Sequence, residues 1–287
     1  MLPCRKHFIA ILFACAVMAC SGTAASNERI VSIGGDVTEI LYALGLEDRL
    51  IAVDSTSSYP AVAKKLPNVG YMRQLSAEPV LALAPDHILA IADAGPESAV
   101  NVLKQAGVRY TVIPDEPSVE GTLAKIHAVA TAVDQPSAGE RLAEGFRRAV
   151  DAVRNRVGEP SKRPRTLFLL SVGRGGLMAG GRGTSADAII RLSGGKNIAA
   201  DFEGYKPFEP EAMNALDPQV IIVTDRTLAA LGGRDAILVQ PQFAGTSAAK
   251  SGRLVAMDGM LMLGFGPRLP QAITGLAAAL HPQGAAE

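Results

Sequence analysis

Short apolar runs rich in β-branched residues alternate with helical patterns along most of the chain, and this alternation constrains the fold more than any other feature. Runs of the first kind favour strands. They lie at residues 30–33, 50–53, 87–91 and 110–113, and then at 166–171, 220–223 and 254–257. Strands that alternate with helices predict an α/β fold with open, mostly parallel sheets, which bind ligands at the carboxyl ends of their strands.

One long helical pattern interrupts this alternation between residues 137 and 157. Apolar residues form a stripe at helical spacing, and charged residues take the opposite face. The stripe consists of Leu142, Phe146, Ala149, Val150, Val153 and Val157. A helix of about 20 residues is about 30 Å long, which is enough to cross from one lobe to another. We therefore predict an N-terminal lobe at residues 27–136, an interlobe helix at 137–158 and a C-terminal lobe at 159–287.

A short internal repeat supports the division into two lobes. Residues 78–89 align with residues 211–222 at one constant offset, and Glu, Leu, Pro and Ile recur in both copies. Each copy predicts a helix, a turn with proline and a central strand. Two similar Rossmann-like lobes joined by one long helix leave a ligand cleft between them. The alternative explanation is a chance match between two common helix–strand units.

Residues 1–26 have the pattern of a secretory signal peptide, with two basic residues, an apolar run from 8 to 19 and then small residues. The apolar run is too short to be read as a membrane span. We expect cleavage after Ala25 or Ser26, and the alternative is a lipoprotein box that ends at Cys20, which would then carry a lipid anchor. All cysteines of the chain lie in this segment, so the mature chain would have no disulfide and no thiol chemistry. They are Cys4, Cys15 and Cys20.

The composition argues against several classes of function. The chain carries 28 Lys and Arg residues and 28 Asp and Glu residues, and this balance argues against a nucleic acid as the partner. It contains no tryptophan, so a sugar-binding platform of stacked indoles is not expected. The sequence also has no G-x-S-x-G nucleophile motif and no zinc-type cluster of His and Cys. We therefore expect a binding protein and not an enzyme, with an exported hydrolase as the alternative from a different class.

Residues 70–78 read Gly-Tyr-Met-Arg-Gln-Leu-Ser-Ala-Glu and place a phenol and a guanidinium two residues apart on a predicted loop. Tyr71 as a phenolate is a hard oxygen ligand that suits ferric iron, and tyrosine is a known axial ligand of haem. A free phenol has a pKa of about 10, so a nearby cation such as Arg73 would have to favour the anion. The alternative is a half-buried loop tyrosine beside a solvated arginine.

Five segments carry a resemblance to a known family. Residues 30–35, 38–41 and 84–86 are typical of the substrate-binding proteins of bacterial ABC importers, of the type with two lobes and a rigid helix between them. Residues 69–78 and 183–187 are more specific, and they are similar to segments of the periplasmic haem-binding proteins of haem uptake systems. The likeness covers essentially the whole mature chain. It implies a periplasmic carrier that binds haem as its transported ligand.

The resemblance implies roles for single residues in the cleft. Tyr71 would be the axial ligand of ferric haem, and Arg73 would donate a hydrogen bond to the phenolate or pair with a haem propionate. Arg226 follows a strand of the second lobe and would reach into the cleft from the other side, because a guanidinium pairs bidentately with carboxylates. The alternative for Arg226 is a solvated loop charge or a partner of Asp225.

Glu78 and Glu211, one in each copy of the repeat, correspond to the acidic residues with which such proteins dock onto basic pockets of the membrane permease. The alternative is a pair of ordinary glutamates favoured by the dipoles of helix N-termini. The implied partners are an ABC permease with its ATPase subunit and, indirectly, an outer-membrane haem uptake system. We expect a monomer.

One departure from the family pattern concerns the number of haems. Some relatives have a histidine after the first strand of the second lobe, associated with a second haem, but residues 170–176 of this chain contain none. This absence favours a single haem, and the alternative is a second haem that is held without that ligand. We expect structural roles for His87 and His127. We expect core positions for Met260 and Met262, and the alternative is that these methionines line the cleft. A ferric-siderophore or corrinoid carrier of the same fold is the alternative among binding proteins.

Overall fold

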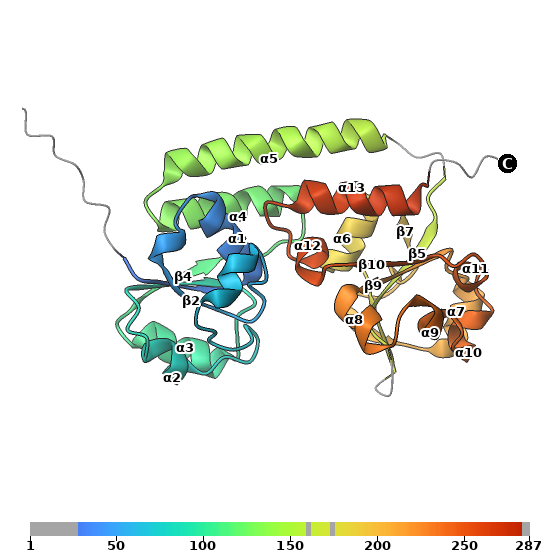
Figure 1. Ribbon diagram of the computed structural model, residues 1–287, viewed down its shortest axis with the longest axis horizontal. Coiled ribbons are helices and arrows are strands. Elements are labelled where there is room, and N and C mark those ends of the chain that lie inside the picture. The colour runs from blue at the N-terminus through green and yellow to red at the C-terminus, as the bar shows by residue number, and fades with distance from the viewer. Residues whose placement is uncertain (1–27, 159–161, 173–175, 283–287) are drawn as a thin grey trace, which may run out of the picture.

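The structure is a computed structural model that describes residues 28–158, 162–172 and 176–282. The expected signal peptide at residues 1–26, with its cysteines and the lipid site at Cys20, lies outside the described residues. Residues 173–175, which belong to the segment without a histidine, also lie outside the described residues. The described residues form two α/β lobes, and the long helix α5 (Pro136–Val157) lies across both of them (Figure 1). None of the helices in these ranges is long and apolar enough to cross a membrane.

The first lobe contains a four-stranded sheet in the order β2-β1-β3-β4, and all its described pairings are parallel. Its strands are β1 (Ile30–Ile33), β2 (Leu50–Val53), β3 (His87–Ile91) and β4 (Arg109–Ile113), and its helices are α1 (Gly35–Ala43), α2 (Ala77–Leu81), α3 (Glu97–Gln105) and α4 (Val119–Ala132), with 3-10 turns at Glu47–Arg49 and Ala61–Lys65. Every residue of β1 and β3 is buried, because helices cover both faces of the sheet.

The second lobe contains a sheet in the order β10-β9-β5-β6-β8, with β7 paired to β5. Strands β5, β9 and β10 run parallel, whereas β6 is antiparallel to both of its neighbours. The strands are β5 (Arg165–Ser171), β6 (Leu177–Gly180), β7 (Lys196–Asn197), β8 (Tyr205–Phe208), β9 (Val220–Thr224) and β10 (Leu254–Met257), and the helices are α6 (Ser185–Leu192), α7 (Pro210–Leu216), α8 (Asp225–Ala230), α9 (Arg234–Leu238), α10 (Pro241–Ala244), α11 (Ser247–Lys250), α12 (Gly259–Leu263) and α13 (Leu269–Leu280).

One apolar core runs through both lobes. Helix α5 packs against α4 of the first lobe and against α13 of the second (Figure 1). Phe146 and Val150 of α5 are buried in the same cluster as Ile126 of α4, Phe168 of β5 and Ile273 of α13. Because interiors are close-packed, this shared core resists a hinge motion between the lobes.

A buried charge cluster adds a second connection between the lobes. The Lys125 ammonium on α4 is fully buried, and it pairs with Asp36 of α1 and donates to Asp115 over 2.8 Å. It also donates to the backbone carbonyl of Gly264 over 3.2 Å, and Gly264 lies in the segment between α12 and α13 of the second lobe. The burial of Asp36 raises the pKa of its carboxyl, although the charge of Lys125 acts against this.

The same segment is attached to the first lobe by an arginine. Arg268 donates to the carboxylate of Glu39 on α1 over 2.9 Å, and its guanidinium lies 3.8 Å from the ring centre of Tyr59. Burial raises the pKa of Glu39, while the hydrogen bond and charge of Arg268 oppose that rise. Residues 264–268 are therefore bound to the first lobe, although they come from the second.

The internal repeat is present in the structure. Helix α2 and strand β3 correspond to α7 and β9, and both strands lie inside their sheets. Ala84 and Asp217, which occupy the same repeat position, both have left-handed backbones with φ of 45° and 42°. The following proline cannot continue a helix, so the chain turns at the same place in both lobes.

Two helix boundaries of the first lobe lie beside the candidate ligand loop and the first strand. Helix α2 ends at Leu81, and the Ser76 hydroxyl before it makes no capping hydrogen bond. Helix α1 begins at Gly35, directly after β1. A side chain at Gly35 would come within 2.4 Å of the Thr56 carbonyl, so only glycine allows this close approach.

Candidate ligand-binding site

The loop that carries Tyr71 is fixed at the carboxyl end of the first sheet. The N–H of Ser55, which follows β2, donates to the carbonyl of Gly70 over 2.8 Å. The N–H of Leu75 donates to Gly95 and the N–H of Gly95 donates to Met72, both over 2.8 Å, so the loop is also joined to the turn after β3. Ligands bind at this edge of parallel sheets.

Tyr71 and Arg73 are in direct contact, as the sequence spacing suggests. Arg73 Nη1 donates to the Tyr71 hydroxyl oxygen over 2.9 Å, and its Nη2 donates to Asp93 over 2.8 Å. Burial lowers the pKa of Arg73, but the hydrogen bonds to Asp93 and Tyr71 outweigh it and hold the pKa above its ordinary value. Tyr71 is 39% exposed. The structure therefore presents an accessible phenol oxygen beside a permanent cation.

Tyr205 of the second lobe lies near this group, and the sequence analysis missed it. Burial raises the pKa of its hydroxyl, while hydrogen bonds to the Ala186 backbone and the Thr184 side chain, together with the charge of Arg73, lower it. Arg73 of the first lobe therefore lies within electrostatic range of Tyr205 of the second. The Tyr205 ring also packs edge-on against Phe168, with ring centres 6.4 Å apart.

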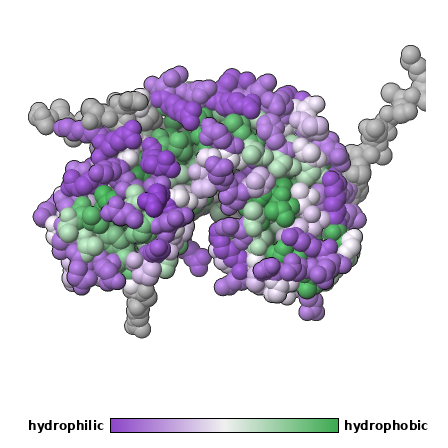
Figure 2. Space-filling view, turned by 180° about the vertical axis from the view of Figure 1, so that it is seen from behind, coloured by the Kyte–Doolittle hydropathy of each residue, from purple (hydrophilic) through white to green (hydrophobic). Residues whose placement is uncertain are grey.

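Both lobes leave some large apolar side chains exposed. Tyr59 and Tyr71 follow β2 in the first lobe, Leu170 lies at the end of β5, and Tyr205 begins β8. The space-filling view shows a notch that separates the two lobes (Figure 2). Exposed large apolar groups and concave surfaces are both features of ligand sites.

Arg226 lies on α8, which is on the side of the second lobe that faces the first lobe (Figure 1). The Thr224 hydroxyl caps this helix, and Thr227 donates to the carbonyl of Leu170 over 3.2 Å, which ties α8 to the end of β5. Arg226 is exposed. Within the described residues it forms no ion pair with Asp225 and no hydrogen bond to the Tyr71–Arg73 pair.

Glu78 and Glu211 occupy the first turns of α2 and α7, one in each lobe. Both are exposed, and neither carboxylate forms an ion pair within the described part of the chain. The short helices that carry them lie away from α5, on the lower half of the molecule in Figure 1. The two carboxylates are thus free to meet a partner.

Two histidines and two methionines were expected to be structural. His87 is fully buried, with its Nε2 2.8 Å from the Thr111 hydroxyl. His127 is 38% exposed on α4, and its Nδ1 lies 3.8 Å from Glu140. Met262 is fully buried in the core, whereas Met260 is partly exposed.

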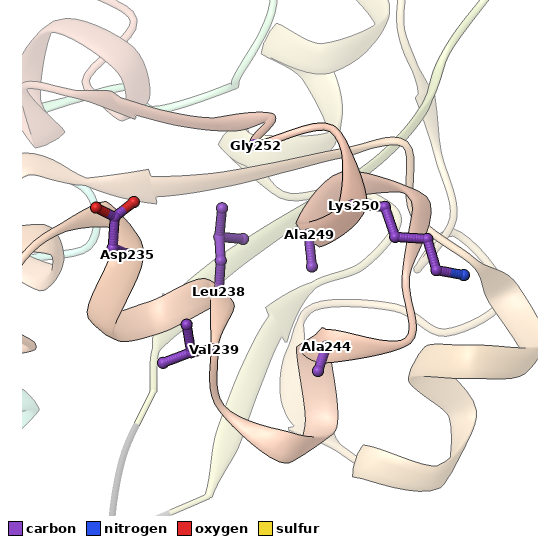
Figure 3. A pocket seen from close by; sticks show the side chains of 7 residues that line it. All are labelled: Asp235, Leu238, Val239, Ala244, Ala249, Lys250 and Gly252. Carbon is purple, nitrogen blue, oxygen red and sulfur yellow. The ribbon is translucent and has the colours of Figure 1, made fainter.

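A separate surface pocket lies on the second lobe, among α9, α10 and α11 (Figure 3). Leu238, Val239 and Ala249 form its apolar lining, and Asp235 and Lys250 lie at its sides. None of the residues predicted to bind ligand or to dock lines this pocket.

Comparisons with known proteins agree with this two-lobed arrangement. Residues 30–261 match the family described as periplasmic binding protein. The structure is similar to that of the periplasmic heme-binding protein BhuT in complex with two hemes, with a TM-score of 0.84, 41% identity and coverage of 88% of this chain and 97% of that chain. It is also similar to the apo form of the periplasmic heme-binding protein RhuT from Roseiflexus sp. RS-1, with a TM-score of 0.85, 39% identity and coverage of 88% and 97%.

A vitamin B12-binding protein from Yersinia pestis is 32% identical to this chain over 202 residues, which cover 70% of this chain and 71% of that protein. The family and its structural neighbours are transport proteins that bind solutes, and not enzymes. The match over most of its length, together with two lobes and a cleft between them, shows that the chain belongs to the periplasmic binding protein family, whose members deliver solutes to ABC transporters.

Proposed function

We propose that this protein carries ferric haem in the periplasm, with Tyr71 as the iron ligand. The observation that supports this most directly is the 2.9 Å hydrogen bond from Arg73 to the phenol oxygen. The phenol oxygen is a hard ligand that suits ferric iron, and this hydrogen bond fixes it at an exposed position of the loop. The similarity to BhuT and RhuT, both described as heme-binding, supports the same ligand.

The walls of the cleft suit a flat, largely apolar ligand. Tyr59, Leu170 and Tyr205 offer apolar surface to a porphyrin face, and the Tyr205 hydroxyl approaches from the lobe opposite Tyr71. Arg226 is an exposed cation on the inner side of the second lobe and would pair with a propionate, because guanidinium and carboxylate groups form two parallel hydrogen bonds.

Export and delivery complete the proposal. Residues 1–26 direct secretion, and the mature protein binds haem that an outer-membrane uptake system supplies. Glu78 and Glu211 dock onto the ABC permease, which acts with its ATPase subunit. The division at 27–136, 137–158 and 159–287 gives one docking carboxylate to each lobe, and the protein works as a monomer.

Absorption titration of the purified mature protein with ferric haem tests this function. We expect saturable binding and a spectrum typical of a ferric phenolate complex, because phenolate-to-iron charge transfer adds absorption that free haem lacks. An absence of saturable binding at micromolar haem would reject the proposal.

A corrinoid carrier is the second candidate, because a vitamin B12-binding protein is 32% identical to this chain. The same preparation should therefore be titrated with cobalamin and with a ferric siderophore. The haem proposal requires that haem binds more tightly than either. If cobalamin binds more tightly than haem, the protein is instead a corrinoid carrier.

A further inference from the structure

Asp93 is an exposed carboxylate at the carboxyl end of the first sheet. It lies in the turn after β3, 20 residues along the chain from Arg73, and accepts a hydrogen bond from Arg73 Nη2 over 2.8 Å. The other terminal nitrogen of the same guanidinium donates to the Tyr71 hydroxyl over 2.9 Å. One arginine thus links a carboxylate on one side to the candidate iron ligand on the other.

The backbone holds these two segments together independently of the side chains. The reciprocal hydrogen bonds between Gly95 and the Met72–Leu75 segment fix the turn that carries Asp93 against the loop that carries Tyr71. Asp93 is therefore kept within reach of Arg73 whatever the rotamer of the arginine. Within the described residues the Asp93 carboxylate has no other hydrogen-bond partner, so its removal should not disturb the fold.

Arg73 needs such an anchor. Its side chain is 49% exposed, and a long exposed arginine loses rotamer freedom when it is held in one geometry. The planar fork of the guanidinium fixes the direction of one nitrogen once the other is bound. With Asp93 in place, Nη1 is aimed at the phenol oxygen before any ligand arrives.

We infer that Asp93 is a positioning residue for the Tyr71 site: it orients Arg73 toward the oxygen that binds iron, and so determines how tightly and for how long ferric haem is held. This inference rests on the proposed function and adds to it a residue that itself need not touch the haem. Its effect passes through Arg73 alone.

Variants of Asp93 separate an orienting role from a simple charge effect. Asp93→Asn keeps an oxygen that accepts from Arg73 but removes the negative charge, whereas Asp93→Ala removes both. We expect Asp93→Ala to weaken haem binding about tenfold, because hydrogen bonds to charged groups contribute about that much. Asp93→Asn should stay within about threefold of the unchanged protein. Glu97→Ala, which removes an exposed carboxylate nearby, is the matched control and should have no effect.

Two readouts distinguish this role from a merely structural one. The phenolate-to-iron charge-transfer band should move in Asp93→Ala toward its position in Arg73→Ala, and should stay in place in Asp93→Asn. In a double-mutant cycle, Asp93→Ala should cause no further loss of haem affinity when Arg73 is already replaced by alanine. An unshifted band and wild-type affinity in Asp93→Ala would overturn the inference, as would an equal loss in both backgrounds.

A failure of the proposed function would be recognised separately. If the unchanged protein binds no haem, the function is wrong whatever Asp93 does. The orientation of Arg73 would then be read from crystal structures of the ligand-free Asp93→Ala and Asp93→Asn proteins. We expect the arginine to leave the Tyr71 hydroxyl in the first and to keep it in the second. An unchanged Arg73–Tyr71 contact in Asp93→Ala refutes the positioning role.

Discussion

Replacement of Lys125 by methionine should destabilise the protein by about 3–5 kcal/mol, which is the cost of leaving buried charges without their partner. The Lys125 side chain is fully buried, and its ammonium has three partners: Asp36, Asp115 and the Gly264 carbonyl. Three donors thus meet three acceptors, and methionine, which has a similar volume, supplies none. Two carboxylates and a carbonyl lose their donor at the junction of the two lobes.

The loss of stability in Lys125→Met should be larger at high pH than at low pH. Burial already raises the folded-state pKa of Asp36 above 3.8, and Lys125 acts against that rise. Without the ammonium the folded-state pKa rises further, so the folded variant holds a proton that the unfolded chain releases. The proton bound to Asp36 stabilises the folded state. This stabilisation is complete below the pKa of Asp36 in the unfolded chain, and it is lost as the pH rises through the pKa of Asp36 in the folded protein. The stability lost on replacing Lys125 should therefore grow as the pH rises above the unfolded pKa of this carboxyl.

Urea unfolding of the mature protein, followed by circular dichroism, measures both effects. Lys64→Met removes an exposed lysine in the same lobe and should change the free energy of unfolding by less than about 0.5 kcal/mol. Asp36→Asn combined with Lys125→Met should recover part of the loss, because one buried charge is removed. A loss of stability below about 1 kcal/mol for Lys125→Met, or a loss that grows as the pH falls, would refute the reasoning.

Three further predictions concern the cleft and its outer edge. Glu78→Arg with Glu211→Arg should leave the haem titration unchanged and stop haem delivery to vesicles that contain the permease; normal delivery would remove the docking role. Arg226→Ala should weaken haem binding about tenfold and should not affect a haem whose propionates are esterified; an equal loss for both haems would contradict the pairing. Tyr205→Phe should keep the charge-transfer band while affinity falls by less than tenfold; loss of the band would make Tyr205 the ligand instead.

The periodic parts of the fold could be predicted from the sequence, because the signal is local. The β-branched runs that became β1, β3 and β9 are bounded by turn residues, and the long helix has an apolar stripe that could be read directly. The repeat was also readable, since both copies keep proline after the turn. The pairing of β6 and β8 was not, because it depends on contacts between segments far apart in the chain.

In the candidate site as well, the local contacts could be predicted from the sequence and the contacts between distant segments could not. Tyr71 and Arg73 lie two residues apart, so their contact follows from local spacing. Asp93 meets Arg73 only because backbone hydrogen bonds join two loops, and Tyr205 approaches from the other lobe. Lys125 was missed for a related reason: its partner Asp36 lies 89 residues away, and a lysine in a helical pattern is expected to be exposed.

The central claim is that the phenol oxygen of Tyr71 binds ferric iron, and the absorption and resonance Raman spectra of haem-loaded Tyr71→Phe test it most directly. Phenylalanine keeps the ring and removes the oxygen, and Tyr42→Phe on α1 serves as the control tyrosine. We predict that the phenolate-to-iron band and the iron–phenolate vibration disappear in Tyr71→Phe and remain in Tyr42→Phe, with at least a tenfold loss of haem affinity in the first alone. A Tyr71→Phe protein that binds haem with the same spectrum and affinity would contradict the account.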